Sequence, residues 1–325
     1  MTAPPSALIA RPLIVRLRNW VGDVVLGLPT LQRLTDAGYD LRLVGKAWAR
    51  DLLAGHGWPV SVLPSGLRAR VALLRSLRRQ ALADDTTFSS RVNAMALPFS
   101  FSSALDMRLA GLRAIGHAHE GRGWLLSRSV VRPQGRHELE VYWHLGSALL
   151  GTAAPLPTHI ALRPTAAHHA QAAALLAARG IGAGFIVICP FAGGTFAGQD
   201  KTWPAFADFV AHQLPSLGRP LVVCPGPGEE AVAREHFHHA TLLPEVGLGT
   251  YAALLSRAAL MIANDTGPGH VAAAVAAPVL SVLGPSDAAQ WRAWGPTVHI
   301  VQGRPPAPSW PSRDEVLAAA RALIG

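Results

Sequence analysis

A polar and glycine-rich segment stands out in the sequence: Asn264-Asp265-Thr266-Gly267-Pro268-Gly269-His270. The apolar run before it, residues 258–263, predicts a buried strand, and the small residues after it predict a helix that ends before Pro278. The start of such a helix presents unpaired N–H groups and the positive end of its dipole, which together favour phosphate. Asp265 or Thr266 alone could be an ordinary helix cap. Capping does not call for a whole polar cluster ending in His270, so the segment predicts a phosphate site.

Two more polar loops follow predicted strands. The loop 18–23 ends in Gly22-Asp23 at a helix start, where the dipole would keep a carboxylate ionised, so Asp23 is either a general base or a plain cap. The loop 190–204 carries glycines, Thr195 and Lys201, and it looks like a phosphate cradle although it is no Walker loop. Lys46 and Lys201 are the only lysines among 29 basic residues. A lysine at position 201 in such an arginine-rich chain therefore points to a specific role.

A third loop, 226–231, formally matches the dinucleotide fingerprint. Glu229 and Glu230, however, stand at the helix start, where a pyrophosphate needs positive potential. A glutamate here is better suited to accept hydrogen bonds from ribose hydroxyls.

Composition limits the class of protein. The chain has 325 residues, half of them apolar, with nine Trp and a net charge of +9, which indicates a globular protein with an anionic partner: nucleic acid, a membrane surface or an acidic substrate. No apolar run reaches the roughly 18 residues of a membrane span. Prolines interrupt residues 1–12 where a signal peptide would be apolar, so we expect a cytoplasmic protein. Cys189 and Cys224 each end an apolar run and are expected to be buried thiols.

Strand and helix patterns alternate along the chain, which predicts an α/β protein with parallel, doubly wound sheets. We expect two Rossmann-like domains, residues 1–155 and 156–310, facing each other across a ligand cleft. A C-terminal helix, 311–325, is expected to pack back toward the N-terminal domain. The helix predicted over 67–82 carries five arginines, which form either an ordinary solvated face or a docking surface for an anionic membrane.

The motifs together resemble the ADP-heptose:lipopolysaccharide heptosyltransferases of glycosyltransferase family 9, which have the two-domain GT-B fold. Gly22-Asp23 follows the first strand, and Asp200-Lys201-Thr202-Trp203-Pro204, the 264–270 segment and Gly284-Pro285-Ser286 lie in the second half. Residues 100–105, Gly121-Arg122 and 137–142 resemble the heptosyltransferase II branch, so the likeness covers nearly the whole chain. The family usually has Asn where Phe99 stands.

The resemblance implies an inverting, metal-independent sugar transfer with no cofactor besides a nucleotide-sugar co-substrate, ADP-heptose. By this likeness, Asp23 would be the catalytic base and Lys201 would neutralise the departing phosphate. The other donor-binding positions would be Thr195, Glu229 or Glu230, Asp265, Thr266, Gly267 and His270. Arg18 and Arg122 would bind a phosphorylated or carboxylated acceptor.

The leading prediction is therefore heptose transfer to a hydroxyl of the lipopolysaccharide inner core, an anionic lipid-linked glycan, by a cytoplasmic protein that contacts the inner membrane. The nearest alternative is a family 9 enzyme with another nucleotide-sugar donor or glycan acceptor. A sugar-nucleotide epimerase would need further acid and base groups that the sequence does not offer. A non-catalytic basic binding protein is a remote alternative, and no aromatic and basic interleaving supports nucleic acid as its partner.

Overall fold

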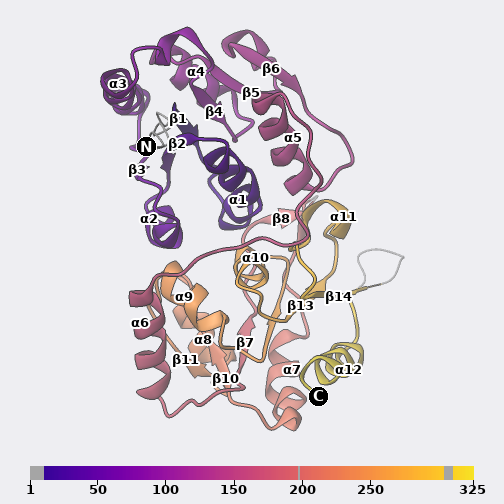
Figure 1. Ribbon diagram of the computed structural model, residues 1–325. Helices are drawn as coiled ribbons and strands as arrows, with labels where there is room; N and C mark the ends of the chain where they lie inside the picture. The colour runs from indigo at the N-terminus through magenta and orange to yellow at the C-terminus, as the bar shows by residue number, and fades with distance from the viewer. Residues whose placement is uncertain (1–10, 197, 304–309) are drawn as a thin grey trace, which may run out of the picture. The chain divides into compact units, whose positions relative to one another are not determined.

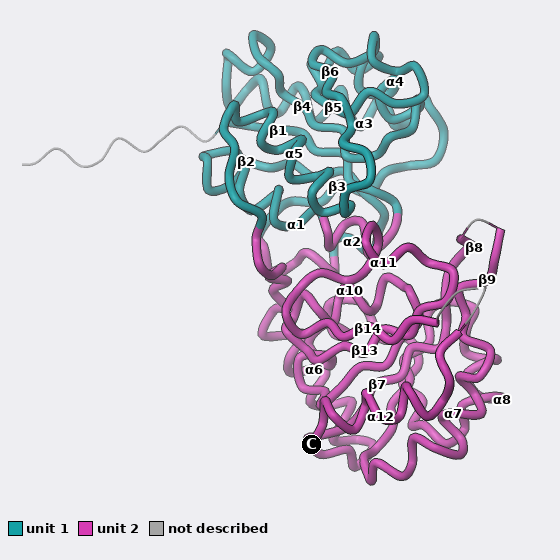
Figure 2. The backbone as a smooth tube through the Cα atoms, turned by 90° about the vertical axis from the view of Figure 1, so that its right-hand side faces the viewer, with its two compact units in different colours: residues 1–19, 27–50, 57–156 teal, residues 20–26, 51–56, 157–325 magenta. Residues whose placement is uncertain are grey.

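The computed structural model describes residues 11–196, 198–303 and 310–325 (Figure 1). The chain forms two compact units, coloured separately in Figure 2. The first comprises residues 1–19, 27–50 and 57–156, and the second 20–26, 51–56 and 157–325. The start of the chain, on which the prediction of no secretion signal rests, lies largely outside the described residues. Within the described part of the chain, no helix combines the length and apolar character needed to cross a membrane.

The first unit contains a six-stranded parallel sheet in the order β3-β2-β1-β4-β5-β6. Its strands are β1 (Arg11–Arg16), β2 (Tyr39–Gly45), β3 (Val60–Val62), β4 (Ala94–Ala96), β5 (Ala114–Ala118) and β6 (Arg128–Val131). The strand order reverses between β1 and β4. Loops that follow these two strands at the carboxyl edge are where a doubly wound sheet binds its ligands.

Helices α3 (Leu67–Asp84) and α4 (Phe101–Leu109) lie side by side against this sheet (Figures 1 and 2). Apolar positions at helical spacing explain α3: Val71, Leu74, Leu77 and Ala81 are buried, and the residues between them are half-buried or exposed. They join Met107 and the strands in one core. The first unit also contains most of α1 (Val21–Asp36) and α2 (Trp48–Leu52), all of α5 (Glu138–Leu150) and the 3₁₀ turns η2 (Phe88–Ser90) and η3 (Arg122–Leu125), whereas the 3₁₀ turn η1 (Ala54–His56) groups with the second unit.

The second unit contains a second six-stranded parallel sheet, in the order β11-β10-β7-β12-β13-β14. Its strands are β7 (Ile186–Cys189), β10 (Leu221–Val223), β11 (Thr241–Leu242), β12 (Leu260–Ala263), β13 (Val279–Leu283) and β14 (Val298–Gln302). A two-stranded antiparallel hairpin, β8 (Thr195–Phe196) with β9 (Gln199–Asp200), stands apart from it. Here the order reverses between β7 and β12. The two sheets thus share one topology, and the GT-B fold expected from the sequence is confirmed.

The second unit's helices are α6 (Ala166–Ala177), α7 (Phe206–His212), α8 (Glu230–His236), α9 (Leu248–Leu255), α10 (Gly267–Ala274), α11 (Ala288–Trp291) and α12 (Arg313–Ile324), with the 3₁₀ turn η4 (Leu214–Leu217). The expectation that the last helix packs toward the N-terminal domain is wrong. Val316 and Ala320 of α12 are fully buried in the core of the second sheet with Trp203 and Phe209. The helix places its apolar face there because it follows directly on Trp310, which packs against the same core.

Candidate active site

The loops after β7 and β12 border the reversal point of the second sheet, and both carry motifs singled out in the sequence. Residues 190–204 follow β7, and Asn264-Asp265-Thr266 follow β12 and lead into α10. Residues at the carboxyl ends of adjacent parallel strands lie at one edge, so the topology alone brings these two loops together.

Asn264 ties the two loops to each other. Its Nδ2 donates to the carbonyl of Pro190 at 2.6 Å, and its Oδ1 accepts from the N–H of Trp203 at 3.1 Å. Both groups are buried, and Asn264 is only 1% exposed. Its amide thus satisfies backbone groups at both ends of the 190–203 loop, which fixes the position of Lys201 two residues before Trp203.

Lys201 reaches across to the β12 loop. Its ammonium donates to the carbonyl oxygen of Asp265 at 3.1 Å and lies 3.6 Å from that residue's Oδ2. Oδ2 also accepts a hydrogen bond from the Ser286 hydroxyl at 2.7 Å, and Ser286 follows β13. The ammonium and carboxylate side chains are 18% and 14% exposed, so both keep some access to solvent. A charged donor is therefore held at the carboxyl edge beside a helix start.

That helix is α10, which begins at Gly267 with Thr266 as its N-cap. Thr266 is in extended conformation, and its side chain makes no capping hydrogen bond, so a plain cap does not explain this threonine. His270 lies in the same turn and is 8% exposed. Burial lowers the pKa of His270, and Lys201 lowers it further, although Asp265 and Asp23 act in the opposite direction. The ring is therefore neutral at neutral pH.

Gly22 and Asp23 belong to residues 20–26, which group with the second unit. A Cβ on Gly22 would come within 2.9 Å of the His270 ring, so glycine is needed at this close approach. Asp23 is the third residue of α1 and not its N-cap, which removes the simplest structural explanation for it. Its carboxylate is half-buried and close enough to influence the pKa of His270.

The remaining donor candidates differ in their surroundings. Thr195 is exposed on the β8–β9 hairpin and pairs in register with Asp200. The carboxylate of Glu229 accepts from the N–H of Gly226 at 2.7 Å and closes the loop after β10. Glu230 instead pairs with Arg234 at 3.1 Å on the outer face of α8.

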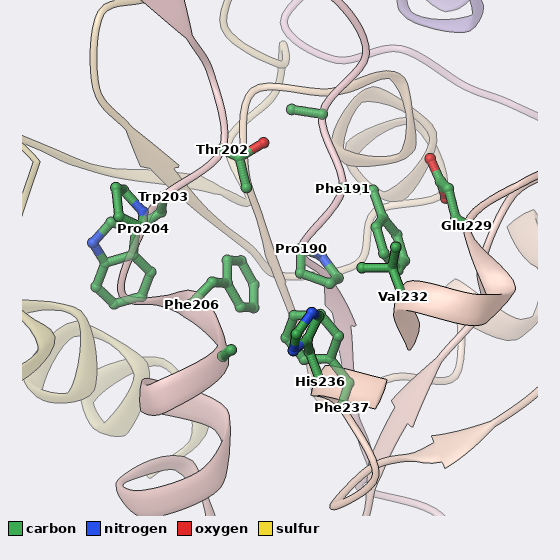
Figure 3. Close-up of a pocket in the computed structure, with 12 residues that line it drawn as sticks. Pro190, Phe191, Thr202, Trp203, Pro204, Phe206, Glu229, Val232, His236 and Phe237 are labelled. Atoms are coloured by element: carbon green, nitrogen blue, oxygen red, sulfur yellow. The ribbon is translucent and has the colours of Figure 1, made fainter. Parts of the chain in front are cut away.

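A cavity of about 460 Å³ opens beside the β7 loop (Figure 3). Phe191 and Val232 lie on one side of it and Phe206 on the other, and Glu229 lies on the same side as Phe191. Its walls are mainly apolar. Of the two glutamates, Glu229 is the one that contributes to this cavity.

In the first unit the structure separates the two predicted acceptor arginines. Arg18 is half-buried in the loop after β1, with its guanidinium 4.5 Å from the centre of the Phe99 ring. Arg122 is 0% exposed, and burial lowers its pKa to about 10. It donates to the carbonyls of Pro98 at 2.6 Å, Ser100 at 2.9 Å and His117 at 3.0 Å. Arg122 therefore holds the loop after β4 in place, and the prediction that it contacts an acceptor is wrong, because its guanidinium is sealed from solvent.

Sequence patterns missed the residues that surround Arg18. Phe99 also lies 4.5 Å under the guanidinium of Arg132, which is paired with the buried Glu138 at 2.8 Å. His117 is 0% exposed, and neither ring nitrogen has a hydrogen-bond partner among the described residues. These side chains come from β5, from the connections after β4 and β6 and from α5, so no local motif could reveal them.

Two further sequence predictions concern thiols and metals. Cys189 is buried, and burial raises the pKa of its thiol to about 12, while burial also raises the pKa of the half-buried Cys224. Both thiols are therefore protonated and unreactive. Within the described ranges, no group of three or more His, Cys, Asp or Glu is arranged to hold a metal ion.

Comparison with known proteins gives similarities in sequence and in fold. One segment of 62 residues is 45% identical to lipopolysaccharide heptosyltransferase 3 of Escherichia coli K12; it covers 19% of this chain and only 16% of that relative. The fold is similar to E. coli ADP-heptose LPS heptosyltransferase II, with a TM-score of 0.77, 22% identity and coverage of 96% of this chain and 98% of the other. It is also similar to E. coli heptosyltransferase WaaC with ADP, with a TM-score of 0.70, 20% identity and coverage of 96% and 99%.

The family assignment comes from a match of the sequence to a model that describes a protein family. Residues 92–316, more than half of the chain, match the model of glycosyltransferase family 9 (heptosyltransferase). The matched range contains Lys201, Asp265 and Thr266 with the loops that hold them. This chain is a member of glycosyltransferase family 9, the heptosyltransferase family.

Proposed function

We propose that the protein is an inverting heptosyltransferase that moves heptose from ADP-heptose to a hydroxyl of the lipopolysaccharide inner core. One observation carries the proposal: the Lys201 ammonium is held 3.1 Å from the Asp265 carbonyl, next to the start of α10. A fixed ammonium and the N–H groups of a helix start are what a departing diphosphate requires. The similarity to a structure that contains ADP supports adenosine diphosphate as the leaving group.

In the proposed reaction Asp23 removes the proton of the acceptor hydroxyl. The resulting oxygen attacks the anomeric carbon from the face opposite the phosphate, and the bond from that carbon to the β-phosphate oxygen breaks. ADP leaves with the bonding electrons, and its new charge is balanced by Lys201 and by the N–H groups at Gly267. Thr266 would bind a phosphate oxygen, and Asp265 would accept hydrogen bonds from sugar hydroxyls.

The neutral ring of His270 suits this arrangement. A charged imidazole in the first turn of α10 would hydrogen-bond tightly to Asp265 or Asp23 and weaken each as a hydrogen-bond acceptor. Burial keeps the ring neutral, so both carboxylates remain available to hydroxyl groups. Glu229, on the wall of the cavity in Figure 3, would reach the ribose, whereas Glu230 is engaged with Arg234.

For the acceptor we propose an anionic, lipid-linked glycan recognised in the first unit through Arg18. The guanidinium of Arg18 lies 4.5 Å from the centre of the Phe99 ring, and a guanidinium supported in this way is suited to recognise a carboxylate or phosphate. Such an acceptor resides on the inner face of the cytoplasmic membrane, which is where we propose that the enzyme works.

A donor panel tests this function. Purified protein is given ADP-heptose, UDP-sugars or GDP-sugars with lipid A that carries the acidic octulosonate Kdo, and the glycolipid product is followed by mass spectrometry. Asp23→Asn keeps the size of the side chain and removes the base, so transfer should fall roughly 10²- to 10⁴-fold. EDTA should leave the rate unchanged.

The outcomes separate the alternatives. Transfer from ADP-heptose that is lost in Asp23→Asn supports the proposal. Transfer only from another nucleotide sugar would make the protein a family 9 enzyme of different donor specificity. Absence of donor binding across the whole panel would favour the remote alternative, a non-catalytic basic binding protein.

A further inference from the structure

Arginine side chains on α3 and α4 outnumber the acidic ones in a way that packing does not require. The two helices contain five and one arginines respectively but only one acidic residue each, Asp84 and Asp106. Asp106 is buried and paired with Arg70 at 2.6 Å, and Asp84 pairs with Arg42 of β2. Both acidic groups are therefore used within the fold, and the outward side of the helices keeps an unbalanced positive charge.

The outward arginines form a stripe. Arg68, Ala72, Arg75 and Arg79 recur at intervals of four, three and four residues and are all exposed, on the side of α3 opposite the buried Leu77 and Ala81. Arg108 is exposed on the neighbouring α4. The side chain of Arg75 donates to the carbonyl of Leu109 at 3.0 Å, which ties the stripe to the end of α4.

Two large aromatic side chains lie exposed at the start of the same helix pair. Trp124 is 72% exposed on η3 and Phe101 is 38% exposed in the first turn of α4. Their ring centres are 6.2 Å apart, and η3 packs against α4, so the two rings form one apolar patch. Exposed tryptophan beside arginine is typical of surfaces that enter the interface of a bilayer.

The aromatic patch lies at the carboxyl edge of the first sheet. Phe101 begins the helix after β4, and Trp124 lies in the connection between β5 and β6. The Arg18 loop, which follows β1, belongs to the same edge. A membrane contacted by the aromatic patch would thus lie close to the point where a lipid-linked acceptor must enter.

We propose that Arg68, Arg75, Arg79, Arg108, Phe101 and Trp124 form a membrane-docking face for an anionic bilayer. The arginines attract the negatively charged lipid headgroups, and the two rings insert at headgroup depth. The face brings the enzyme to the surface that carries its acceptor. The identity of the acceptor rests on the proposed function. Binding of the face to a bilayer does not, because it is measured without any sugar transfer.

Vesicle co-sedimentation tests the face directly. The full chain is mixed with vesicles of phosphatidylcholine alone or with phosphatidylglycerol added, at low and high salt. We expect binding only to the anionic vesicles, weakened at high salt because screening shortens the reach of the charges. Removing two arginines in Arg68→Gln/Arg79→Gln should weaken binding roughly 10- to 30-fold. The matched control is Arg113→Gln/Arg257→Gln, which removes the same charge from exposed positions elsewhere.

The aromatic patch has its own test. Phe101→Ser/Trp124→Ser should lower binding to anionic vesicles, while Leu156→Ser, at another exposed apolar position, should not. With ADP-heptose, the same aromatic variant should react more slowly on acceptor embedded in vesicles but at the normal rate on water-soluble deacylated acceptor. A role in acceptor binding alone would slow both reactions and overturn the proposal.

Equal weakening by the control variants, equal binding to neutral vesicles, or no vesicle binding by the wild type would also contradict it. Binding to an oligonucleotide in place of vesicles would assign the arginine stripe to nucleic acid instead. If vesicles bind as expected and no sugar is transferred, the docking face stands and the proposed function fails.

Discussion

The carboxyl edges of the two sheets have the same topology but opposite chemistry. At the second sheet, the loops after β7 and β12 are joined by the hydrogen bonds of Asn264, and one lysine lies beside a helix start. At the first sheet, arginines pack on Phe99, and Arg122 and His117 are completely buried. The comparison teaches that one doubly wound frame can present backbone and ammonium groups at one edge and guanidinium groups supported by an aromatic ring at the other. These are the groups to which we assign the diphosphate and the anionic glycan in the proposed function.

The largest expected effect is at Lys201. Lys201→Ala removes the fixed positive charge that would meet the leaving diphosphate, so kcat should fall roughly 10²- to 10³-fold. The matched control is Lys46→Ala, because Lys46 is the other lysine of the chain and is exposed. Steady-state transfer assays measure both. Similar transfer rates for the two variants would show that the ammonium of Lys201 does not assist the leaving diphosphate at the edge of the second sheet.

Arg122 and Arg18 sharpen the comparison within the first unit. Arg122→Met deletes charged donors to three backbone carbonyls, two of them in buried hydrogen bonds, so the free energy of unfolding should fall by about 3 kcal/mol. Arg18→Met should cost less than about 1 kcal/mol, because this side chain is half-buried at the edge. Urea unfolding of both variants gives the answer. Equal losses in the free energy of unfolding would mean that Arg18 contributes as much to the stability of the fold as Arg122.

His117 gives the first edge a pH dependence. Burial, with His144, Arg132 and Arg122 nearby, lowers its pKa to about 3 from 6.5. Below pH 6.5 the His117 side chain therefore binds a proton in the unfolded chain but not in the folded chain. The contribution of neutral His117 to the free energy of unfolding is therefore complete above pH 6.5. It declines as the pH falls toward 3, by about 1.4 kcal/mol per pH unit.

His117→Phe should remove that part of the decline, about 2 kcal/mol between pH 7 and pH 5. Urea midpoints at the two pH values measure the change, with His169→Phe, at an exposed position, as the control. An unchanged decline in His117→Phe would show that this histidine accepts a proton in the folded protein.

The smallest expected effect distinguishes two adjacent glutamates of the second unit. Glu229 lies on the cavity wall and Glu230 pairs outward with Arg234. Glu229→Ala should raise the donor KM roughly tenfold, equivalent to about 1.4 kcal/mol, and Glu230→Ala less than twofold. The reverse order would move the ribose site to the other glutamate.

Sequence patterns predicted the second edge far better than the first. The motif 264–270 and Lys201 are local, since a strand, a turn and a helix start can be recognised within a dozen residues. Asp23 is local in the same way, although the strand before it, β1, belongs to the first sheet. Phe99, His117 and Arg132 are brought together only by the order of β4, β5 and β6, which local patterns do not contain. Arg122 shows the same limit, because nothing in Gly121-Arg122 reveals that the guanidinium is buried.

The two doubly wound parallel sheets were predicted correctly, whereas the packing of the last helix was not. The strand predicted within 258–263 forms β12 (Leu260–Ala263), and the helix predicted over 67–82 forms α3 (Leu67–Asp84), because the apolar residues of each segment follow the spacing of the element that it forms. The edge strands β6 and β14 are harder to recognise in the sequence, because all their residues are exposed or half-buried and they lack the buried apolar run of a central strand. The destination of α12 was mistaken because an amphipathic helix does not specify which sheet it covers.

Equilibrium binding of ADP is the most direct test of the proposal that the donor binds at the edge of the second sheet and the acceptor at the edge of the first. Titration calorimetry would compare the wild type with Lys201→Ala and Arg18→Ala in the full chain. We expect ADP affinity to fall at least tenfold in Lys201→Ala and to stay unchanged in Arg18→Ala. Loss of ADP binding in Arg18→Ala with full retention in Lys201→Ala would contradict the assignment of the donor to the second unit.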